Sequence, residues 1–486
     1  MEEAGSTRSH DGEAETTRVA ATRGMQADWP ALQDEGKLEY HVPAAFDATR
    51  PGFIYTRDEY DTSIQDHPVA SRLPRPTAET SVYSDLSNLI DLARRKDGPK
   101  KLDDFLYSDE PQLSLHIVSF RDATLVSVSW LHTFMDAMAL SAVLDAWVLV
   151  LNGREAEVPP VCNFAKDPLS LLGVAPTEPH ALAQKQLTGF NLVLFSLRYV
   201  FDLVFYRDSQ RTIYLAPQHL QSMKEAALRY LDDELCADTA TDDDGSGTAA
   251  PPDPQRLPRP FLSDGDVLCA FITRLAVRHL PPASTQQVGM VNAFDLRRAL
   301  ASSVLPPSAG VCLSNAVFLV SAFGRVCDIL ARPLGFTAAL VRRAIVEQGT
   351  AAQVDALAAL TRTSVGQTGR PVVFGDGATR LVIFSNWTKA GFFALDFGAA
   401  VAVSGGGDKP EPGGDAGSAE ATAKPSFVNL TGESSGLSPR GSWPILGREP
   451  GGGYWLQGNL RSDLWAKVEE ELLTRDPQPD ARQQEA

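Results

Sequence analysis

The sequence predicts a mixed α/β protein built in two halves. Strand-like and helix-like patterns alternate along its 486 residues, and an acidic, proline-containing segment at 236–258 resembles a linker between domains. Hydrophobic residues make up 43% of the chain and charged residues 22%, which is typical of an ordinary globular protein. A chain of this length suggests two to three domains and permits a large buried core.

The first half is expected to contain a disordered segment, 1–25, followed by a folded domain over 26–235. The segment is polar and lacks periodicity and any apolar run typical of a secretory signal. In the domain, 113–120 and 124–130 each suit a strand, with Arg121-Asp122-Ala123 as the hairpin turn. A largely buried helix over 137–152 and an amphipathic helix over 216–231 are predicted to follow.

The most apolar stretch of the chain is 190–206. Arg198 and Asp202 interrupt it, and it is short for a transmembrane helix. We therefore predict a buried helix and no membrane span.

The second half is expected to form a domain over 259–486. Residues 404–424 are rich in Gly, Pro, Ala and Glu and are predicted to be a flexible insertion at its surface. Ser263 is expected to cap a helix that runs to His279. The other predicted elements are strands at 288–294, 316–322, 372–374, 381–384, 394–397 and 454–460, and helices at 335–348 and 463–473.

Charge and cysteine content exclude some functions. The formal net charge is −17, whereas proteins that bind nucleic acid need a concentrated basic surface, so no nucleic-acid partner is expected. Five cysteines without a CxxC pair favour buried free thiols and a reducing, cytoplasmic location. No cluster with metal-ligand spacing occurs, so neither a metal nor a permanently bound cofactor is expected.

The sharpest local feature is the segment 126–147, VSVSWLHTFMDAMALSAVLDAW. It places His132 after a predicted strand and before a helix, with Asp136 four residues later. A neutral histidine there can take a proton from a nucleophilic hydroxyl and return it to a leaving group. Asp136 either orients the imidazole or holds the turn by pairing elsewhere. On this motif alone, a histidine that merely caps the helix is an equally good interpretation, because H-x-x-x-D recurs by chance.

The segment resembles the HxxxD element of the BAHD acyltransferases and of their fungal relatives of the trichothecene acetyltransferase type. Other elements similar to that family follow in its order, and together the likeness covers roughly residues 105–475. They are Phe294-Asp295-Leu296-Arg297 (v-D-v-R), Leu313-Ser314-Asn315-Ala316 (G-N), Ser385-Asn386-Trp387 (T/S-x-W) and Asp396-Phe397-Gly398 (DFGWG). Two positions depart from the pattern, since Ser314 replaces the Gly of G-N and Ala399 the Trp of DFGWG.

The resemblance implies two chloramphenicol-acetyltransferase-like domains with an active-site channel between them. Acyl-CoA is the implied co-substrate, and a hydroxyl or amine of a small molecule, such as a fungal secondary metabolite, is the implied acceptor. His132 would act as the general base, without a covalent acyl-enzyme. A monomer is expected, because the family's site lies between domains of one chain.

The resemblance also implies supporting roles. Asp136 is expected to pair with Arg297 and so to join the two halves, and Asp396 to hold a turn. Ser385 and Trp387 match positions that bind the acceptor or the developing oxyanion, although Trp387 equally suits a core position.

Two alternatives within the superfamily stay open. Peptide-synthetase condensation domains usually carry HHxxxDG, whereas Leu131 precedes His132 and Ala137 follows Asp136, which favours a free-standing transferase. The altered DFG tail leaves room for a catalytically silent relative that acts as a binding or regulatory protein.

Overall fold

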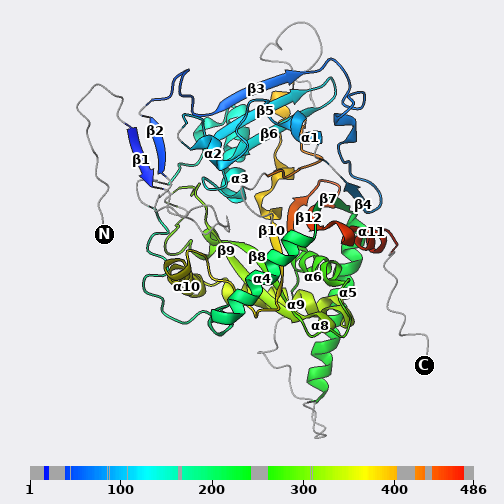
Figure 1. Cartoon of the computed structure of the whole chain (residues 1–486). Coiled ribbons are helices and arrows are strands. Elements are labelled where there is room, and N and C mark those ends of the chain that lie inside the picture. Colours follow the sequence, from blue (N-terminus) through cyan, green and yellow to red (C-terminus); the bar gives the residue numbers. More distant parts are fainter. Residues whose placement is uncertain are drawn as a thin grey trace, which may run out of the picture.

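The computed structural model describes most of the chain as two sheets with their helices (Figure 1). It describes residues 16–20, 39–43, 45–84, 86, 88–106, 108–162, 167–241, 261–306, 308, 310–401, 422–432 and 440–474. Strands and helices alternate along both halves, so the predicted mixed α/β class is confirmed.

The smaller sheet has three strands in the order β3-β5-β6. β5 (Leu113–Ser119) and β6 (Thr124–Trp130) are antiparallel, with Ser119 opposite Thr124, as the predicted hairpin requires. β3 (Ile54–Glu59) runs parallel to β5. The short helices α1 (Asn88–Ala93) and α2 (Leu102–Phe105) lie beside this sheet (Figure 1).

The larger sheet has seven strands in the order β4-β7-β12-β11-β10-β8-β9. β10 is parallel to β8 and β11, and the other neighbours are antiparallel. A separate pair joins β1 (Thr16–Ala20) to β2 (Glu39–Pro43). The strands of the larger sheet are β4 (Ser81–Ser84), β7 (Asp208–Leu215), β8 (Gln287–Asp295), β9 (Val317–Arg325), β10 (Arg380–Asn386), β11 (Ser442–Arg448) and β12 (Tyr454–Arg461).

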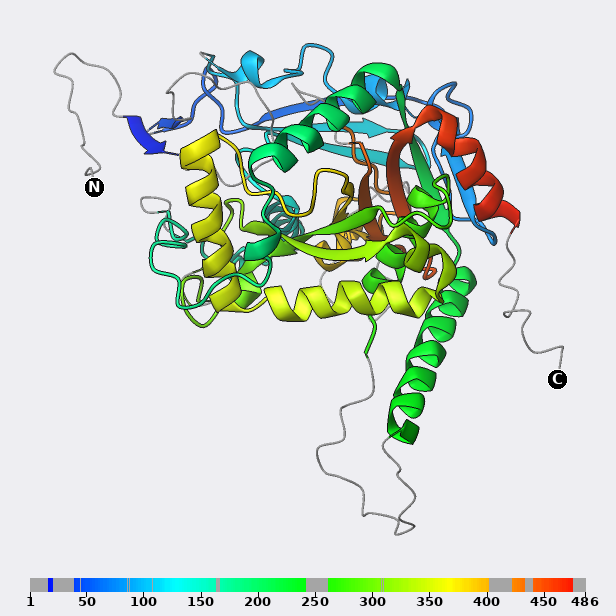
Figure 2. The same cartoon turned by 60° about the horizontal axis from the view of Figure 1, so that its bottom comes forward.

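The main core lies between the larger sheet and the helices that pack on it. Two of the largest fully buried side chains, Trp443 and Trp465, meet there with ring centroids 5.8 Å apart. In Figure 2, α9 and α10 run along the outside of the molecule and α5 extends away from it. The helices of this half are α5 (Pro217–Thr241), α6 (Asp264–Val277), α7 (Leu296–Ala299), α8 (Val326–Ala331), α9 (Leu334–Gln348), α10 (Ala351–Thr368) and α11 (Trp465–Thr474).

The turn after the smaller sheet leads into α3 (Ala137–Leu151), which lies between the two sheets (Figure 1). Its buried residues Ala139 and Leu140 share a hydrophobic cluster with Trp130 of β6 and with Phe392, which follows β10. The Ser141 hydroxyl also donates a hydrogen bond of 2.6 Å to the carbonyl oxygen of Ala390. α3 therefore connects the two halves of the molecule.

Several predicted element bounds differ from the structure. The helix predicted at 216–231 continues to Thr241, inside the segment taken for a linker. Residues 394–397 form no strand and lie at two short 3-10 turns, Phe392–Ala394 and Gly398–Ala400. Of 372–374, only Phe374 pairs, in an isolated bridge with Gln186. Thr16–Ala20 form a strand although 1–25 was predicted disordered, while most of the predicted insertion 404–424 lies outside the described residues.

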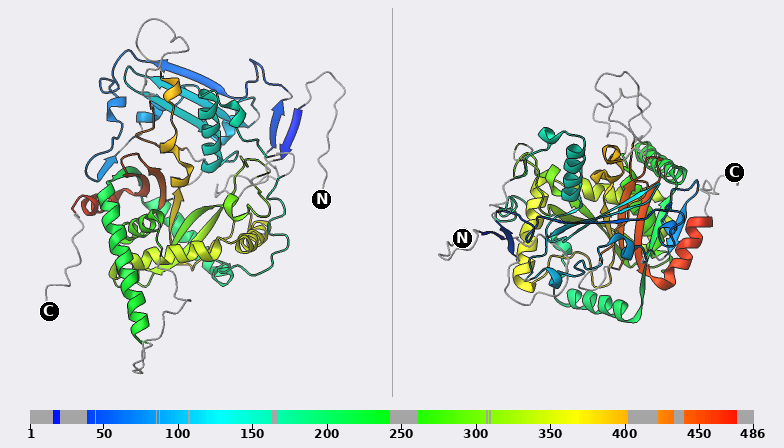
Figure 3. Two further views of the ribbon diagram at one scale, coloured as in Figure 1. Left: turned by 180° about the vertical axis from the view of Figure 1, so that it is seen from behind. Right: turned by 90° about the horizontal axis from the view of Figure 1, so that it is seen from above.

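At 190–206 the sequence correctly predicted a helix, but the prediction that this helix is buried was wrong. The helix is present as α4 (Gly189–Phe205), but Phe195 is its only buried residue. A helix that is apolar on all sides is usually buried, yet α4 lies on the outside of the molecule, at the lower edge of the right-hand view of Figure 3. Among the described residues, no helix is long and apolar enough to cross a membrane.

Candidate active site

His132 lies in the turn that connects β6 to α3. β6 ends at Trp130 and α3 begins at Ala137, so the histidine stands where the sequence predicted it, after a strand and before a helix. Its side chain is exposed, whereas Met135 and Asp136 of the same turn are buried. The turn therefore exposes the imidazole to solvent, while its following residues are packed into the protein.

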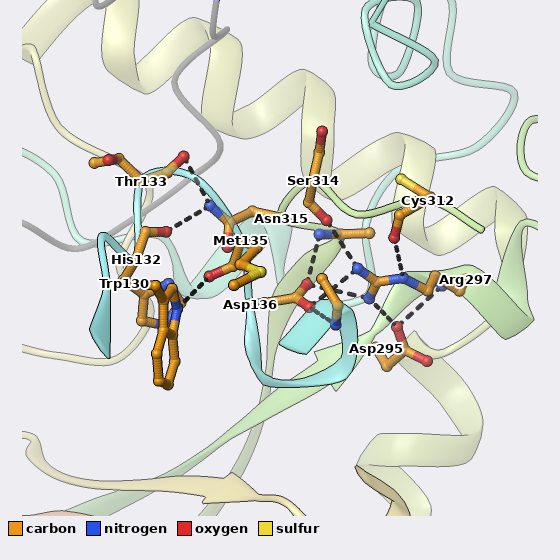
Figure 4. A network of polar contacts seen from close by, with 12 residues as sticks. Trp130, His132, Thr133, Met135, Asp136, Asp295, Arg297, Cys312, Ser314 and Asn315 are labelled. Atoms are coloured by element: carbon orange, nitrogen blue, oxygen red, sulfur yellow. Dashed lines mark hydrogen bonds and ion pairs between the residues drawn. The ribbon is translucent and has the colours of Figure 1, made fainter. Parts of the chain in front are cut away.

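Asp136 is the anchor of this turn (Figure 4). Its Oδ1 accepts hydrogen bonds from the backbone N–H of Ala139, at 2.9 Å, and from Nη2 of Arg297, at 3.0 Å. Its Oδ2 accepts from Nη1 of Arg297, at 3.1 Å, and from the backbone N–H of Ala316, at 2.8 Å. The carboxylate thus caps α3 and binds the guanidinium in a bidentate way. The Asp136–Arg297 ion pair that the resemblance implied is present.

Arg297 is in turn surrounded by acceptors. Besides Asp136 it donates to Asp295 Oδ1 at 2.8 Å, to the carbonyl oxygen of Cys312 at 3.1 Å and to that of Ser314 at 2.8 Å. Burial alone would lower the pKa of the guanidinium, but the charge and hydrogen bonds of Asp136, with a further contribution from Asp295, outweigh burial and raise it. The group is a permanent cation that ties the turn after β6 to the start of α7.

This geometry separates the two interpretations of Asp136. Its carboxylate accepts four hydrogen bonds, and among the described residues none comes from the His132 ring. The aspartate therefore holds the turn rather than the imidazole.

The backbone of the turn is held by a second residue, Asn315. Its side-chain Nδ2 donates to the carbonyl oxygen of His132 at 2.7 Å and to that of Thr133 at 3.3 Å, as Figure 4 shows. Asn315 belongs to the G-N likeness seen in the sequence, but no role was predicted for it. No local pattern could have supplied one, because the contact spans 183 residues of chain.

Ser385 and Trp387 lie at and just after the end of β10 and contact one another. The indole N–H of Trp387 donates to the Ser385 hydroxyl oxygen at 2.9 Å. The Trp387 ring packs edge-on against Phe392, with centroids 5.7 Å apart, and borders the cluster that contains Met135. Trp387 thus packs beside the HxxxD turn and Ser385 contacts Trp387, although no hydrogen bond between described residues joins either side chain to His132.

Asp396 holds a turn. Its Oδ1 accepts from the backbone N–H groups of Gly398 and Ala423, both at 2.9 Å. The hydrogen bond from Ala423, followed by that from Gly398, lowers the pKa of the carboxyl. Ala399, which replaces the family's Trp, is exposed.

Known proteins are similar to this chain in sequence and in fold. Residues 78–416 match the Transferase family. The acetyltransferase sphE of Aspergillus fumigatus is 36% identical over an alignment of 483 residues that covers 95% of this chain and 89% of that protein. The transcriptional regulator calD of Penicillium decumbens is 36% identical over 442 residues, 91% of this chain and 84% of that protein.

Two solved structures have a similar fold. One is TRI101 of F. sporotrichioides complexed with coenzyme A and T-2, with a TM-score of 0.56, 15% identity and coverage of 93% of this chain and 84% of that chain. The other is TRI101 of F. graminearum complexed with ethyl coenzyme A, with a TM-score of 0.54, 17% identity and coverage of 94% and 85%. At these identities the likeness concerns the fold, and it confirms the predicted fold class.

The chain belongs to the Transferase family. The resemblance seen in the sequence and the predicted enzyme class, an acyltransferase, are thereby confirmed.

Proposed function

We propose that the chain transfers an acyl group from an acyl-CoA thioester to a hydroxyl or amine of a small molecule, with His132 as the general base. The observation that carries the proposal is the exposed imidazole on a turn whose backbone and buried anchor are fixed. Fungal relatives named acetyltransferase and O-acyltransferase support the reaction. Solved TRI101 structures complexed with coenzyme A and T-2 mycotoxin or deoxynivalenol support a fungal secondary metabolite as acceptor.

In the proposed reaction the acceptor loses its proton to the unprotonated nitrogen of His132 as its lone pair attacks the thioester carbonyl. The tetrahedral intermediate then expels the CoA thiolate, and the imidazolium returns the proton to that sulfur. One histidine both accepts and returns the proton. Because the acceptor attacks the thioester directly, no serine or cysteine nucleophile is required. Acyl-CoA is a co-substrate and not a bound cofactor in this scheme.

Ser385 is proposed to stabilise the oxyanion. Its hydroxyl oxygen already accepts from the Trp387 indole, so its own O–H is left to donate elsewhere. A donor fixed in this way stabilises charge that appears only in the transition state. Trp387 positions that hydroxyl and contributes to the wall of the acceptor site.

We also propose four further properties of the chain. They are a monomer, a cytoplasmic location, the absence of a nucleic-acid partner, and a division of the chain at 236–258 into two acyltransferase domains. This boundary does not divide the larger sheet, because β7 precedes it but pairs with β12, which follows it, and β4 joins the same sheet through β7.

The experiment is a turnover assay with acetyl-CoA and octanoyl-CoA against a panel of alcohols and amines. Thiol release and the acylated product are both measured, for the wild type and for His132→Ala. We expect release that requires an acceptor and that falls about 10²- to 10⁴-fold in the variant. His219→Ala is the control, since that half-buried histidine lies on α5 and its ring packs on Phe271 at 5.6 Å. Turnover that survives in His132→Ala would reject this base.

A second candidate is a silent relative that binds or regulates. Its specific support is that calD and sdnM, both similar along nearly the whole chain, are named transcriptional regulators. Titration calorimetry with coenzyme A discriminates the two. A folded wild-type protein that neither binds coenzyme A nor releases thiol from either acyl-CoA would favour this candidate over the transferase.

A further inference from the structure

One face of α4 is apolar and open to solvent. Its large apolar side chains recur at spacings of three and four residues, which places them along one side of the helix. We call them the α4 stripe: Phe190, Val193, Leu197, Val200, Phe201, Val204 and Phe205, each between 49% and 79% exposed. The other side packs on the protein through Phe195. In the right-hand view of Figure 3, this helix forms the outer edge of the molecule.

The charges of α4 are arranged unevenly around this stripe. Asp202 turns toward the protein, where its carboxylate lies 3.9 Å from Nη1 of Arg380 and its carbonyl oxygen accepts from Arg440 at 2.6 Å. Arg198, within the helix, and Arg207, just beyond its end, are exposed. Neither arginine forms an ion pair within the described part of the chain. The exposed charges that border the stripe along this segment are therefore positive.

We propose that α4 docks the chain onto the surface of a lipid bilayer that contains anionic phospholipids. Large apolar and aromatic side chains beside arginines are the composition of a helix that lies in a membrane interface, immersed about 5–10 Å. The arginines complement phosphate and carboxylate headgroups. With 17 residues the helix is about 25 Å long, which is short of the roughly 30 Å hydrocarbon core of a bilayer. We therefore place it along the membrane surface and not across the membrane. This surface is separate from the reaction proposed above and does not depend on it.

A second copy of the chain fits this face less well. In a symmetric dimer whose α4 helices cross antiparallel at their centres, Arg198 of each copy would approach Arg198 of the other, and like charges at that distance repel. A stable interface also takes about 20–30 residues from each side, whereas the stripe offers seven side chains.

The test is flotation of the full chain with vesicles of phosphatidylcholine alone or with added phosphatidylserine. The variant Leu197→Ser/Val204→Ser removes two stripe side chains that are 63% and 71% exposed, so its fold should persist, which circular dichroism checks. The matched control Phe53→Ser/Val346→Ser removes two side chains elsewhere in the chain that are 51% and 65% exposed.

We expect the wild type and the control to float with the anionic vesicles, and the stripe variant to bind them about tenfold more weakly. Arg198→Glu should weaken binding to the anionic vesicles severalfold and leave binding to phosphatidylcholine unchanged. Equal binding of the wild type and the folded stripe variant, or no binding of the wild type to either vesicle, would overturn the proposal. A wild-type dimer in sedimentation analysis that becomes a monomer in the stripe variant would assign the face to a second copy instead.

Discussion

At the scale of single residues, the site depends on one carboxylate with four donors. Asp136 is 5% exposed and faces a guanidinium that is itself largely enclosed. Asp136→Asn keeps the shape but removes the charge that Arg297 needs, and removing one partner of a buried pair typically costs about 3–5 kcal/mol. We expect the free energy of unfolding in urea to fall by about that amount.

The matched control for this prediction is Glu157→Gln. It breaks the Arg154–Glu157 pair, which has a comparable distance of 2.6 Å but lies at the surface with half of each side chain exposed. Exposed pairs contribute little, so this variant should unfold like the wild type. A similar loss in both variants would mean that burial does not decide the strength of the Asp136 pair.

Residues of the site differ in how far the sequence could reveal them. His132 and Asp136 stand in one short segment, and their places at a strand end and a helix start followed from local patterns. Arg297 could be paired with Asp136 only through a family resemblance, because 161 residues separate them. The contact of Asn315 with the backbone of His132 was not predicted, since a bond from a side chain to a distant carbonyl leaves no periodic trace in the sequence.

At the scale of elements, the segment around Asp396 is a turn held by a carboxylate. Asp396→Ala removes the acceptor of two backbone N–H groups, those of Gly398 and Ala423. We expect faster hydrogen exchange of these two amides, because local opening no longer breaks a hydrogen bond. Asp376→Ala, which removes the acceptor of Ala378 N–H in another turn, should leave both amides unchanged. Unchanged exchange in Asp396→Ala would show that other contacts hold the turn.

Elements also show where periodicity stops being informative. α4 was predicted as a helix and is one, but its apolar residues lie on two faces: Phe195 is buried, whereas the residues of the α4 stripe are exposed. Helical spacing cannot distinguish packing on the protein from packing on something outside it. The strand predicted at 394–397 was wrong: Leu395 and Phe397 alternate with Asp396 as residues of a strand would, but the segment runs between two short 3-10 turns, Phe392–Ala394 and Gly398–Ala400.

At the scale of the whole molecule, the sheets do not follow the order of the chain. β4 and β7 come from the first half, yet they extend the larger sheet next to β12. Alternation of strands and helices predicted the α/β class, but it contains no information on which strand pairs with which. The Asp136–Arg297 pair and the α3 contact with Ala390 reinforce this connection between the halves, so unfolding should involve both together.

Two histidines contribute to the dependence of overall stability on pH: His180, which is buried, and His279, which is half-buried. Burial lowers the pKa of both His180 and His279 to about 4. The unfolded chain binds a proton at each near pH 6.5, whereas the folded chain does not until about pH 4. Between these values the unfolded state holds more protons, so stability falls as the pH falls, and the loss stops below about pH 4.

For His180, which is 4% exposed and stacks on Phe374 at 5.3 Å, the lost stability amounts to about 3 kcal/mol across this range. His180→Gln cannot be protonated there, so the slope of unfolding free energy against pH between about 6.5 and 4 should become shallower. The measurement is urea unfolding at intervals of pH, with each protein compared with itself at pH about 7.5, where neither state of the wild type carries this proton. That reference removes any change in packing caused by the substitution. An unchanged slope in the variant would mean that the His180 ring is protonated in the folded protein as readily as in the unfolded chain.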